Sequence, residues 1–379
     1  MKIGVLTYYG DLNNCGTNLQ AYATYSALKK YYPNDKVEII PIHTFIALSK
    51  YMRYLPFLTY PFYHKMKEKY NKFKKNCLGI NKEYLIKDVD NALEFIRKRN
   101  YDKIYIGADT VLELDKIPQN YDGLSVYWLK DINTKKYLIA ASSKNVEFNS
   151  LSEKQKKDMQ KAISQFSGIG VRDRATKDLF SNFIDDKYIN YVADPTFTLS
   201  IDYDVTNLYL KKKKLIIPDK SVLIHATFSE KWPRKVVKMF HKLGYTVFAP
   251  RFNTWADIML NDMSPLEQLG IYKYFDLVIT HRFHDCIFSL KNNTPVLVYI
   301  KDKKDLSTNN GESKHISILK DFGLYPQGFL GYCDESGYLN IDIESKIIEI
   351  KKIFNVDAIN FAMKEKSNSY YDYIKSTLI

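Results

Sequence analysis

The segment Thr280–Asp285 brings together two imidazoles, a guanidinium and a carboxylate. It follows the apolar run Phe275–Ile279 and precedes the helical pattern of Cys286–Leu290, so we expect a loop between a strand and a helix. Open α/β sheets bind their ligands at the carboxyl ends of such strands. Arg282 can fork a carboxylate or phosphate, and His284 can move a proton near neutral pH. The alternative is a helix-capping cluster with one buried histidine.

Lysine supplies nearly all of the positive charge, so each arginine is expected to serve through its planar fork. The formal net charge of +13 indicates an anionic partner or substrate. No nucleic-acid-binding signature accompanies the charge, which leaves phosphorylated metabolites and acidic lipid headgroups. The run Lys211–Lys214 is expected to be a solvated linker between two halves of the chain.

The four cysteines lie far apart without a Cys-x-x-Cys pair, so neither a zinc site nor a disulfide framework is expected. Met1 and Lys2 lead directly into a strand-like run, and no apolar run has the length of a spanning helix. We therefore expect a cytoplasmic protein without a signal peptide or a bound metal.

Strand-like runs alternate with helical patterns along the whole chain, which predicts the α/β class with parallel, doubly wound sheets. We expect an N-terminal Rossmann-like domain over residues 1–205, a second one over 215–342, and a helical segment over 343–379 that crosses back to the first. The strands of the first half are expected at Ile3–Thr7, Val37–Ile42, Ile104–Ile106, Tyr137–Ala141, Gly168–Val171 and Ile189–Val192. Those of the second half are expected at Val222–His225, Thr246–Ala249, Leu277–Thr280 and Val296–Ile300.

An insertion over about residues 45–80 differs from the rest, because aromatic and basic residues alternate between Tyr51 and Lys75. One hypothesis is an interfacial helical pair that touches a lipid-linked substrate at the membrane surface. The alternative is a helical insertion whose aromatic side chains pack on the first domain.

The loop Tyr8–Gln20 follows the first predicted strand, and its glycines allow backbone N–H groups to approach a ligand. Asn18 is a candidate cap for the helix that follows. The Gly-x-Gly-x-x-Gly spacing is missing, so a dinucleotide site is not expected, and a structural turn is the alternative. Asp109 also follows a strand, where it can accept hydrogen bonds from sugar hydroxyls or form a turn.

Arg172 lies where a strand becomes a helix, and Asp173 is the predicted N-cap of that helix. A guanidinium beside the positive end of a helix dipole requires a neutralising anion, which is either a ligand or a carboxylate such as Asp194. His225 ends the first strand of the second half and is a candidate donor-side group. Its alternative is a structural histidine with satisfied hydrogen bonds.

Six motifs in a fixed order resemble the polysaccharide pyruvyl transferase family, over about Lys2 to Gly323. They are Asn14–Ala23, Ile106–Asp109, Ile139–Ser142, Gly170–Asp173, Asp194–Phe197, and Arg282–His284 followed by Phe288 and Ser289. The chain departs from the family pattern at Asp285, where glycine is usual, at Leu112, where tryptophan is frequent, and at Lys144, where glycine often stands. Asp285 adds a negative charge beside the expected donor site.

The resemblance implies two Rossmann-like domains facing across a cleft, similar to the glycosyltransferase B fold. It implies phosphoenolpyruvate as the donor, with no further cofactor. By matching position, Arg172 and Arg282 would hold the donor's phosphate and carboxylate, and His284 would be the general acid. The residues expected to orient the saccharide acceptor are Asp11, Asn14, Gly16, Asn18 and Asp109.

Our hypothesis is transfer of the pyruvyl group to a saccharide hydroxyl pair, as a ketal, in surface or exopolysaccharide biosynthesis. The acceptor is either free or lipid-linked, and the second case would bring peripheral membrane contact. Two alternatives stay open. One is a glycosyltransferase B type enzyme that uses a nucleotide sugar, and the other is a saccharide-binding protein without catalytic activity.

Overall fold

The computed structural model describes residues 1–12, 14–43, 56–86, 88–114, 123–144, 146–227, 230–301, 313–334, 339 and 342–378, and gives only the helix for 56–61. The chain divides into two compact units. The first comprises Met1–Tyr54, Tyr70–Leu199 and Lys366–Ile379, and the second comprises Leu55–Lys69 and Ser200–Glu365.

Among the described residues of the first unit, six parallel strands form one sheet in the order β2-β1-β5-β6-β7-β8. They are β1 (Lys2–Leu6), β2 (Lys36–Ile39), β5 (Lys103–Ile106), β6 (Lys135–Ala141), β7 (Gly168–Val171) and β8 (Ile189–Tyr191). The strand order reverses at β1, whose neighbours are β2 and β5. The loops after β1 and β5 therefore diverge, which creates a ligand-binding position at this edge of the sheet.

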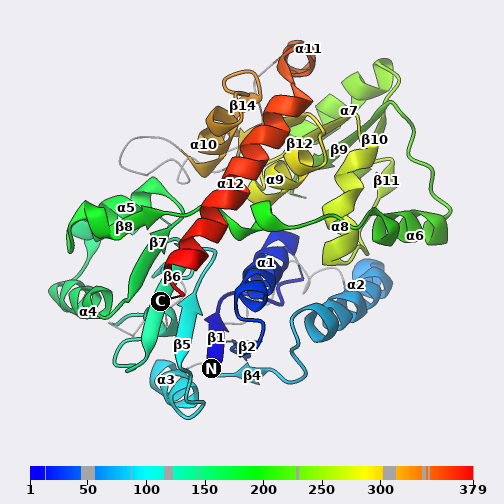
Figure 1. Cartoon of the computed structure of the whole chain (residues 1–379). Helices are drawn as coiled ribbons and strands as arrows, with labels where there is room; N and C mark the ends of the chain where they lie inside the picture. The colour runs from blue at the N-terminus through cyan, green and yellow to red at the C-terminus, as the bar shows by residue number, and fades with distance from the viewer. Residues whose placement is uncertain are drawn as a thin grey trace. The chain divides into compact units, whose positions relative to one another are not determined.

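Helices cover both faces of this sheet (Figure 1). On one face, α3 (Val89–Arg97), α4 (Glu153–Ser164) and α5 (Arg174–Phe180) pack their apolar residues against the strands. On the other face lie α1 (Cys15–Tyr31) and the end of α12 (Val356–Ser376), where the Tyr370 hydroxyl lies 3.2 Å from that of Thr24 in α1. A short pair, β3 (Ile42–His43) with β4 (Tyr84–Leu85), completes the described strands of this unit.

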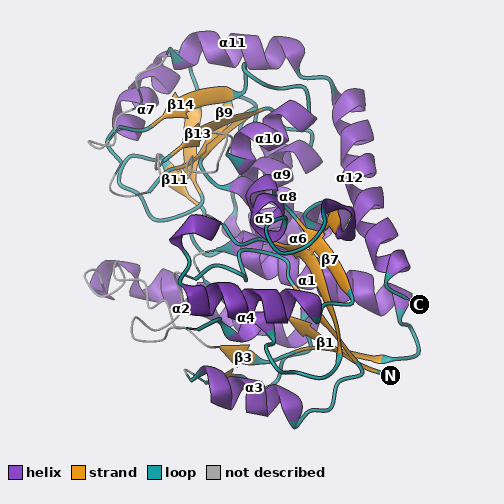
Figure 2. Cartoon of the chain, turned by 90° about the vertical axis from the view of Figure 1, so that its left-hand side faces the viewer, coloured by secondary structure: helices purple, strands orange, loops and turns teal. Residues whose placement is uncertain are grey.

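In the described part of the second unit, six parallel strands are ordered β11-β10-β9-β12-β13-β14. They are β9 (Ser221–His225), β10 (Thr246–Ala249), β11 (Ile258–Met259), β12 (Leu277–Thr280), β13 (Val296–Ile300) and β14 (Phe329–Tyr332). Figure 2 shows helices around these strands. They are α6 (Tyr203–Lys213), α7 (Trp232–Lys242), α8 (Pro265–Ile271), α9 (Phe283–Lys291), α10 (Lys314–Asp321) and α11 (Ile343–Ile353). The order reverses between β9 and β12, where Thr280 is the register partner of His225.

Most predicted strands lie within a residue or two of the observed ones, but two expectations were wrong and three elements were not predicted. Lys211–Lys213 form the last turn of α6 and Lys214 is its C-cap, so this run is not a linker; lysines there interact favourably with the helix dipole. Helix α1 begins at Cys15, and its N-cap is Asn14, not Asn18. The strands β11 and β14 and the helix α3 were not predicted.

The aromatic and basic insertion contains one described helix, α2 (Pro56–Cys77), rather than a helical pair. Between residues 62 and 77, Met66, Tyr70 and Phe73 are buried on one face at helical spacing. The exposed positions of that part of α2 include Lys65, Lys67, Lys72 and Lys75. Phe73 meets Tyr22 of α1 edge-on, with ring centroids 5.8 Å apart, as the second alternative expects, whereas Leu55–Lys69 of the insertion belong to the second unit. Residues 44–55 lie outside the described residues. No described helix is long and apolar enough to cross a bilayer.

The end of α12 closes one face of the first sheet through buried hydrogen bonds. The Tyr373 hydroxyl donates to the carbonyl of Leu138 in β6 at 2.7 Å. The Tyr105 hydroxyl lies 2.7 Å from that of Thr377, and the Lys103 ammonium donates to the Thr377 carbonyl at 3.0 Å. The first unit therefore includes residues from both ends of the chain.

We expect Tyr373→Phe to lower the free energy of unfolding of the first unit by about 1–2 kcal/mol, because a buried hydrogen bond is lost. Urea denaturation followed by circular dichroism measures this change. Tyr371→Phe is the matched control, since Tyr371 is partly exposed on the same helix, and its effect should stay below about 0.5 kcal/mol. Equal losses in the two variants would contradict the role given to Tyr373.

Candidate functional site

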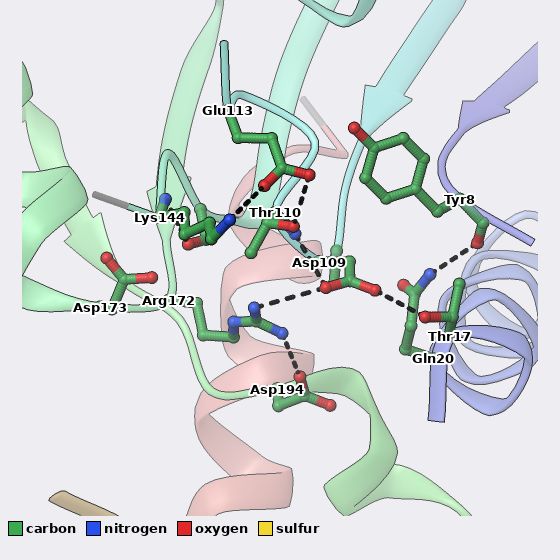
Figure 3. A network of polar contacts seen from close by, with 12 residues as sticks. Tyr8, Thr17, Gln20, Asp109, Thr110, Glu113, Lys144, Arg172, Asp173 and Asp194 are labelled. Carbon is green, nitrogen blue, oxygen red and sulfur yellow. Dashed lines mark hydrogen bonds and ion pairs between the residues drawn. The ribbon is translucent and has the colours of Figure 1, made fainter. Parts of the chain in front are cut away.

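The loops at the strand-order reversal of the first sheet hold a connected polar network (Figure 3). Asp109 follows β5 with a left-handed backbone (φ 76°). One oxygen of Asp109 lies 3.6 Å from Arg172, and Arg172 donates a 2.8 Å hydrogen bond to Asp194. A non-glycine residue held in this conformation, with its carboxylate fixed by neighbours, is typical of a binding or catalytic position.

Arg172 is almost completely buried between these two carboxylates. Burial opposes its charge, but the attraction of Asp194 and Asp109 raises the pKa of Arg172 above its ordinary value. The ion pair with Asp194, expected as the alternative to a bound anion, is therefore present. Two carboxylates face one guanidinium, and this balance does not favour the phosphate that Arg172 was expected to hold.

The other side of Asp109 faces the first turn of α1. Its second oxygen accepts a 3.0 Å hydrogen bond from the Thr17 hydroxyl. The Gln20 amide donates to the Thr7 hydroxyl and to the Tyr8 carbonyl, at 2.9 and 2.8 Å. These contacts fix the loop after β1 and hold Asp109 in place, and neither Thr17 nor Gln20 was singled out from the sequence.

Two of the expected acceptor residues have structural roles instead. The Asn18 amide donates to the carbonyls of Asp11 and Asn14 and its oxygen accepts from Gly10, so this buried side chain holds the loop together. Gly16 is buried inside the first turn of α1. Asp11 is exposed and Asn14 is half-buried at the start of α1, so these two stay compatible with acceptor contact.

The second polar group lies at the strand-order reversal of the second sheet. Arg282 is the N-cap residue of α9, and its backbone N–H donates to the Thr280 hydroxyl at 2.9 Å. The guanidinium and the first N–H groups of α9 therefore lie at the same helix end, which is suited to an anion. Within the part of the chain that the structure describes, Nε of Arg282 is buried without a hydrogen-bond partner.

His225 and Asp285 form a buried pair at this position. Nδ1 of His225 is hydrogen-bonded to Asp285, which also accepts from the Thr280 hydroxyl at 3.2 Å. Burial alone would raise the pKa of Asp285, but the attraction and the hydrogen bond of His225 hold it below its ordinary value. The negative charge of Asp285, expected beside the donor site, is therefore engaged by the imidazole of His225.

A second network supports the backbone of His225. Nδ1 of His281 lies 3.0 Å from the His225 carbonyl and 3.0 Å from the Tyr299 hydroxyl. Tyr299 donates to the buried Glu230 at 2.6 Å, and the Trp232 indole donates to the same carboxylate at 3.2 Å. Since a carbonyl oxygen only accepts, Nδ1 of His281 carries the hydrogen.

His284 lies in the first turn of α9 and is largely buried. Its ring is nearly parallel to that of Phe288, with centroids 6.1 Å apart, and meets Phe283 edge-on at 5.5 Å. This packing fixes the orientation of the imidazole at the helix end that presents Arg282.

The structure thus brings Arg282, His284 and His225 together at one edge of the second sheet, while Arg172 and Asp109 belong to the first unit. Sequence reasoning missed Asp285 as the partner of His225, and it also missed Glu230. The available signal for Asp285 was its departure from the family pattern. Two other departures also have structural roles: Leu112 is buried in the core, and Lys144 lies 3.4 Å from Glu113.

A family model described as polysaccharide pyruvyl transferase matches residues 14–300. The chain belongs to this family. The match covers both polar groups described above, from Asn14 at the start of α1 to the end of β13. No curated protein matches the chain.

Solved structures with a similar fold include sugar-nucleotide epimerases. UDP-GlcNAc 2-epimerase from Neisseria meningitidis, bound to UDP-GlcNAc, superposes with a TM-score of 0.58 at 9% identity and covers 100% of this chain and 99% of that one. UDP-GlcNAc 2-epimerase from Methanocaldococcus jannaschii superposes with a TM-score of 0.54 at 13% identity, and the superposition covers 99% of each chain. These likenesses confirm the predicted α/β class with two Rossmann-like domains of the glycosyltransferase B-like type.

A cavity of about 450 Å³ lies at the opposite, amino-terminal end of the first sheet. It is lined by Asp131, Ile132, Asn133, Thr134, Lys136 and Gln165. Lys136 is the second residue of β6, and its ammonium is already bonded to Leu129 and Gln165. Because ligands of parallel sheets bind at the carboxyl edge, we assign function to the two polar groups rather than to this cavity.

We expect Arg172→Gln to destabilise the first unit by about 3–5 kcal/mol, because it leaves Asp109 and Asp194 as buried carboxylates without their cation. Urea denaturation at neutral pH measures this. Arg174→Gln is the matched control: that arginine is 68% exposed on the next helix, so its removal should cost less than about 0.5 kcal/mol. A small, equal effect of both substitutions would show that the buried trio is not a stabilising unit.

We expect the second unit to lose stability as the pH falls below about 6.5, the ordinary pKa of histidine. Burial holds the pKa of His225 and His281 below that value and lowers the pKa of His315 to about 3. Below pH 6.5 the unfolded chain therefore binds protons that the folded chain excludes, and each histidine contributes a slope on the order of 1.4 kcal/mol per pH unit. Urea denaturation between pH 7.5 and 5 measures the slope. His315→Gln should reduce it, and an unchanged slope would contradict the assignment.

Proposed function

We propose that this family member transfers the pyruvyl group of phosphoenolpyruvate to a hydroxyl pair of a saccharide, forms a cyclic ketal and releases phosphate. The main support is the group at the strand-order reversal of the second sheet, where Arg282, His284 and His225 surround the start of α9. It combines cationic groups for an acidic donor with imidazoles for proton transfer.

The donor would bind through its two acidic groups. Phosphoenolpyruvate has a phosphate and a carboxylate, and Arg282 can fork either with two charge-assisted hydrogen bonds. The N–H groups of the first turn of α9 can receive the other anionic group, because α9 is nine residues long and its N-cap residue, Arg282, makes no side-chain capping hydrogen bond. Arg251, which follows β10, adds positive charge at this edge, since it acts electrostatically on His225.

The chemistry requires four proton movements. The first sugar hydroxyl adds to C2 of the enol, loses its proton, and C3 gains a proton to become a methyl group. The bond between C2 and the phosphate oxygen then breaks, that oxygen gains a proton, and phosphate leaves. The second hydroxyl adds to C2 and loses its proton, which closes the ketal. Two protons leave the sugar, one enters the methyl group and one leaves with phosphate.

His284 is our candidate for the acid that protonates C3. His284 is the second residue of α9 and lies at the same helix end as Arg282. A positioned acid of this kind contributes on the order of 10²–10⁴-fold to the rate. The charge that grows on the departing phosphate is stabilised by Arg282 and the helix end.

The acceptor would meet the first unit, where the network carries more carboxylate than cation. Asp109 can accept hydrogen bonds from sugar hydroxyls, and Arg172 positions it rather than binding phosphate. Asp11 and Asn14 are the loop residues that remain as acceptor contacts. With phosphoenolpyruvate as donor, the reaction belongs in the cytoplasm, and a lipid-linked acceptor would bring the chain to the inner face of the membrane.

A second candidate is a transferase that uses a nucleotide sugar, because the neighbour from Neisseria meningitidis binds UDP-GlcNAc and the start of α9 also suits a diphosphate. Thermal-shift measurements separate the two, since a ligand that binds the folded state raises the unfolding temperature. Stabilisation by UDP or GDP sugars and none by phosphoenolpyruvate would favour the second candidate.

Mass spectrometry of the reaction products tests the proposal directly. The purified full chain is incubated with phosphoenolpyruvate and a panel of free and lipid-linked glycans, and phosphate release is measured in parallel. We expect one acceptor to gain a pyruvate ketal. No phosphate release with any acceptor, together with glycan binding, would replace the proposal by a saccharide-binding role.

We expect Arg282→Gln to reduce kcat/KM for phosphoenolpyruvate by about 10²–10⁴-fold, since two charge-assisted hydrogen bonds are lost at about 1.5–3 kcal/mol each. Arg282→Lys should retain part of the activity, because the charge stays but the fork is lost. Arg234→Gln, an exposed arginine of α7, is the control and should leave kcat/KM unchanged. An unchanged kcat/KM in Arg282→Gln would remove Arg282 from the donor site.

A further inference from the structure

We infer that His225 and Asp285 form a proton-transfer pair. His225 takes the proton of the first attacking hydroxyl and returns it to the departing phosphate, and Asp285 positions His225 for both steps. This inference rests on the proposed function and assigns the base that the proposed function lacks.

The geometry of the pair fixes which nitrogen can act. His225 ends β9, and Asp285 lies in the first turn of α9, which follows the neighbouring strand β12. A carboxylate only accepts hydrogen bonds, so Nδ1 of His225 carries the hydrogen that Asp285 receives. The lone pair of the neutral ring therefore lies on Nε2, which is the basic site.

Both the side chain and the backbone of His225 are held in place. The Thr280 hydroxyl donates to the same Asp285 oxygen as His225 does, which fixes the carboxylate. On the main-chain side, the His225 carbonyl accepts from Nδ1 of His281 at 3.0 Å. A base that is oriented before the substrate arrives needs little reorganisation during the reaction.

The surrounding charges favour a neutral resting base that can be protonated briefly. Asp285 faces His225 from α9, Arg282 from its N-cap, Arg251 from the end of β10 and His281 from the loop after β12. Burial, first, and the two arginines oppose an imidazolium, and together they hold the pKa of His225 below its ordinary value although Asp285 raises it. Once a proton arrives, Asp285 stabilises the imidazolium, because its carboxylate is ionised.

The protons balance when His284 performs the other two transfers. His284 gives a proton to C3 and then removes the proton of the second hydroxyl. His225 begins neutral, takes the proton of the first hydroxyl, and gives it to the oxygen of the leaving phosphate. Both histidines return to their starting states, and no further reactant is required.

The resemblance implies glycine at position 285, and the pair depends on the carboxylate that this chain has there. A glycine there would leave Nδ1 of His225 without its acceptor, and the ring would be free to adopt the other tautomer. We therefore assign Asp285 as a positioning residue and His225 as the catalytic residue it acts through.

The test compares Asp285→Asn, Asp285→Gly and His225→Gln with the unaltered chain. We expect kcat to fall by about 10²–10⁴-fold in each, as expected for loss of a positioned base or of its orienting carboxylate. In Asp285→Asn the acidic limb of the kcat/KM profile should move to lower pH, because the carboxylate that raises the pKa of His225 is gone. His241→Gln is the control, since His241 forms an exposed pair with Asp257 at 3.0 Å, and it should leave rate and profile unchanged.

Nitrogen NMR of the full chain with ¹⁵N-labelled histidine reads the pair without any substrate. We expect His225 to be neutral with its hydrogen on Nδ1. In Asp285→Asn this tautomer should be replaced by the Nε2–H tautomer or by a mixture of the two. Thermal unfolding confirms that each variant is folded, and added imidazole should partly restore His225→Ala. Full activity with an unshifted profile in both Asp285 variants would overturn the inference and leave the proposed function intact. Absence of pyruvyl transfer by the unaltered chain would overturn both, even with the expected tautomer.

Discussion

Parallel strand pairing is the constraint on which this molecule depends. Every described strand of both six-stranded sheets runs parallel to its neighbours, so each connection must cross over the sheet, and all carboxyl ends lie along one edge. The strand order reverses once in each sheet, between β1 and β5 and between β9 and β12. Asp109 and His225 belong to these two positions, although their segments share no sequence pattern beyond a strand followed by polar residues.

The two polar groups differ in charge, and the difference indicates different ligands. Around Arg172, two carboxylates outnumber one cation, which suits neutral hydroxyl groups better than anions. Around the start of α9, Arg282, Arg251 and the helix end outnumber Asp285, whose carboxylate is engaged by His225. A protein that joins a polyhydroxylated acceptor to an acidic donor needs both kinds of environment, and the sequence supplies one in each unit.

Local signals in the sequence predicted much of the fold and some of the site. The Asp173 cap and the strands around β7 and β12 were predicted because their determinants lie within a few residues. Asn18 was predicted as the cap of α1, whereas Asn14 is the cap. Either asparagine can cap a helix, and only the three hydrogen bonds of Asn18 show that it holds the loop instead. The pairing of His225 with Asp285 spans 60 residues and depends on the register of β9 with β12, which no local pattern contains.

The contacts of Tyr373 and Thr377 with the first sheet have a consequence for synthesis in the cell. The first unit is built from segments that lie before and after Ser200–Glu365, the larger segment of the second unit, so its last piece leaves the ribosome only after that segment. Until then one face of β5 and β6 lacks its final helix, and apolar surface stays accessible to chaperones or to other chains. The second unit consists of Ser200–Glu365 and the earlier segment Leu55–Lys69. Its residues are therefore all synthesised before the last segment of the first unit, and the second unit can assemble first.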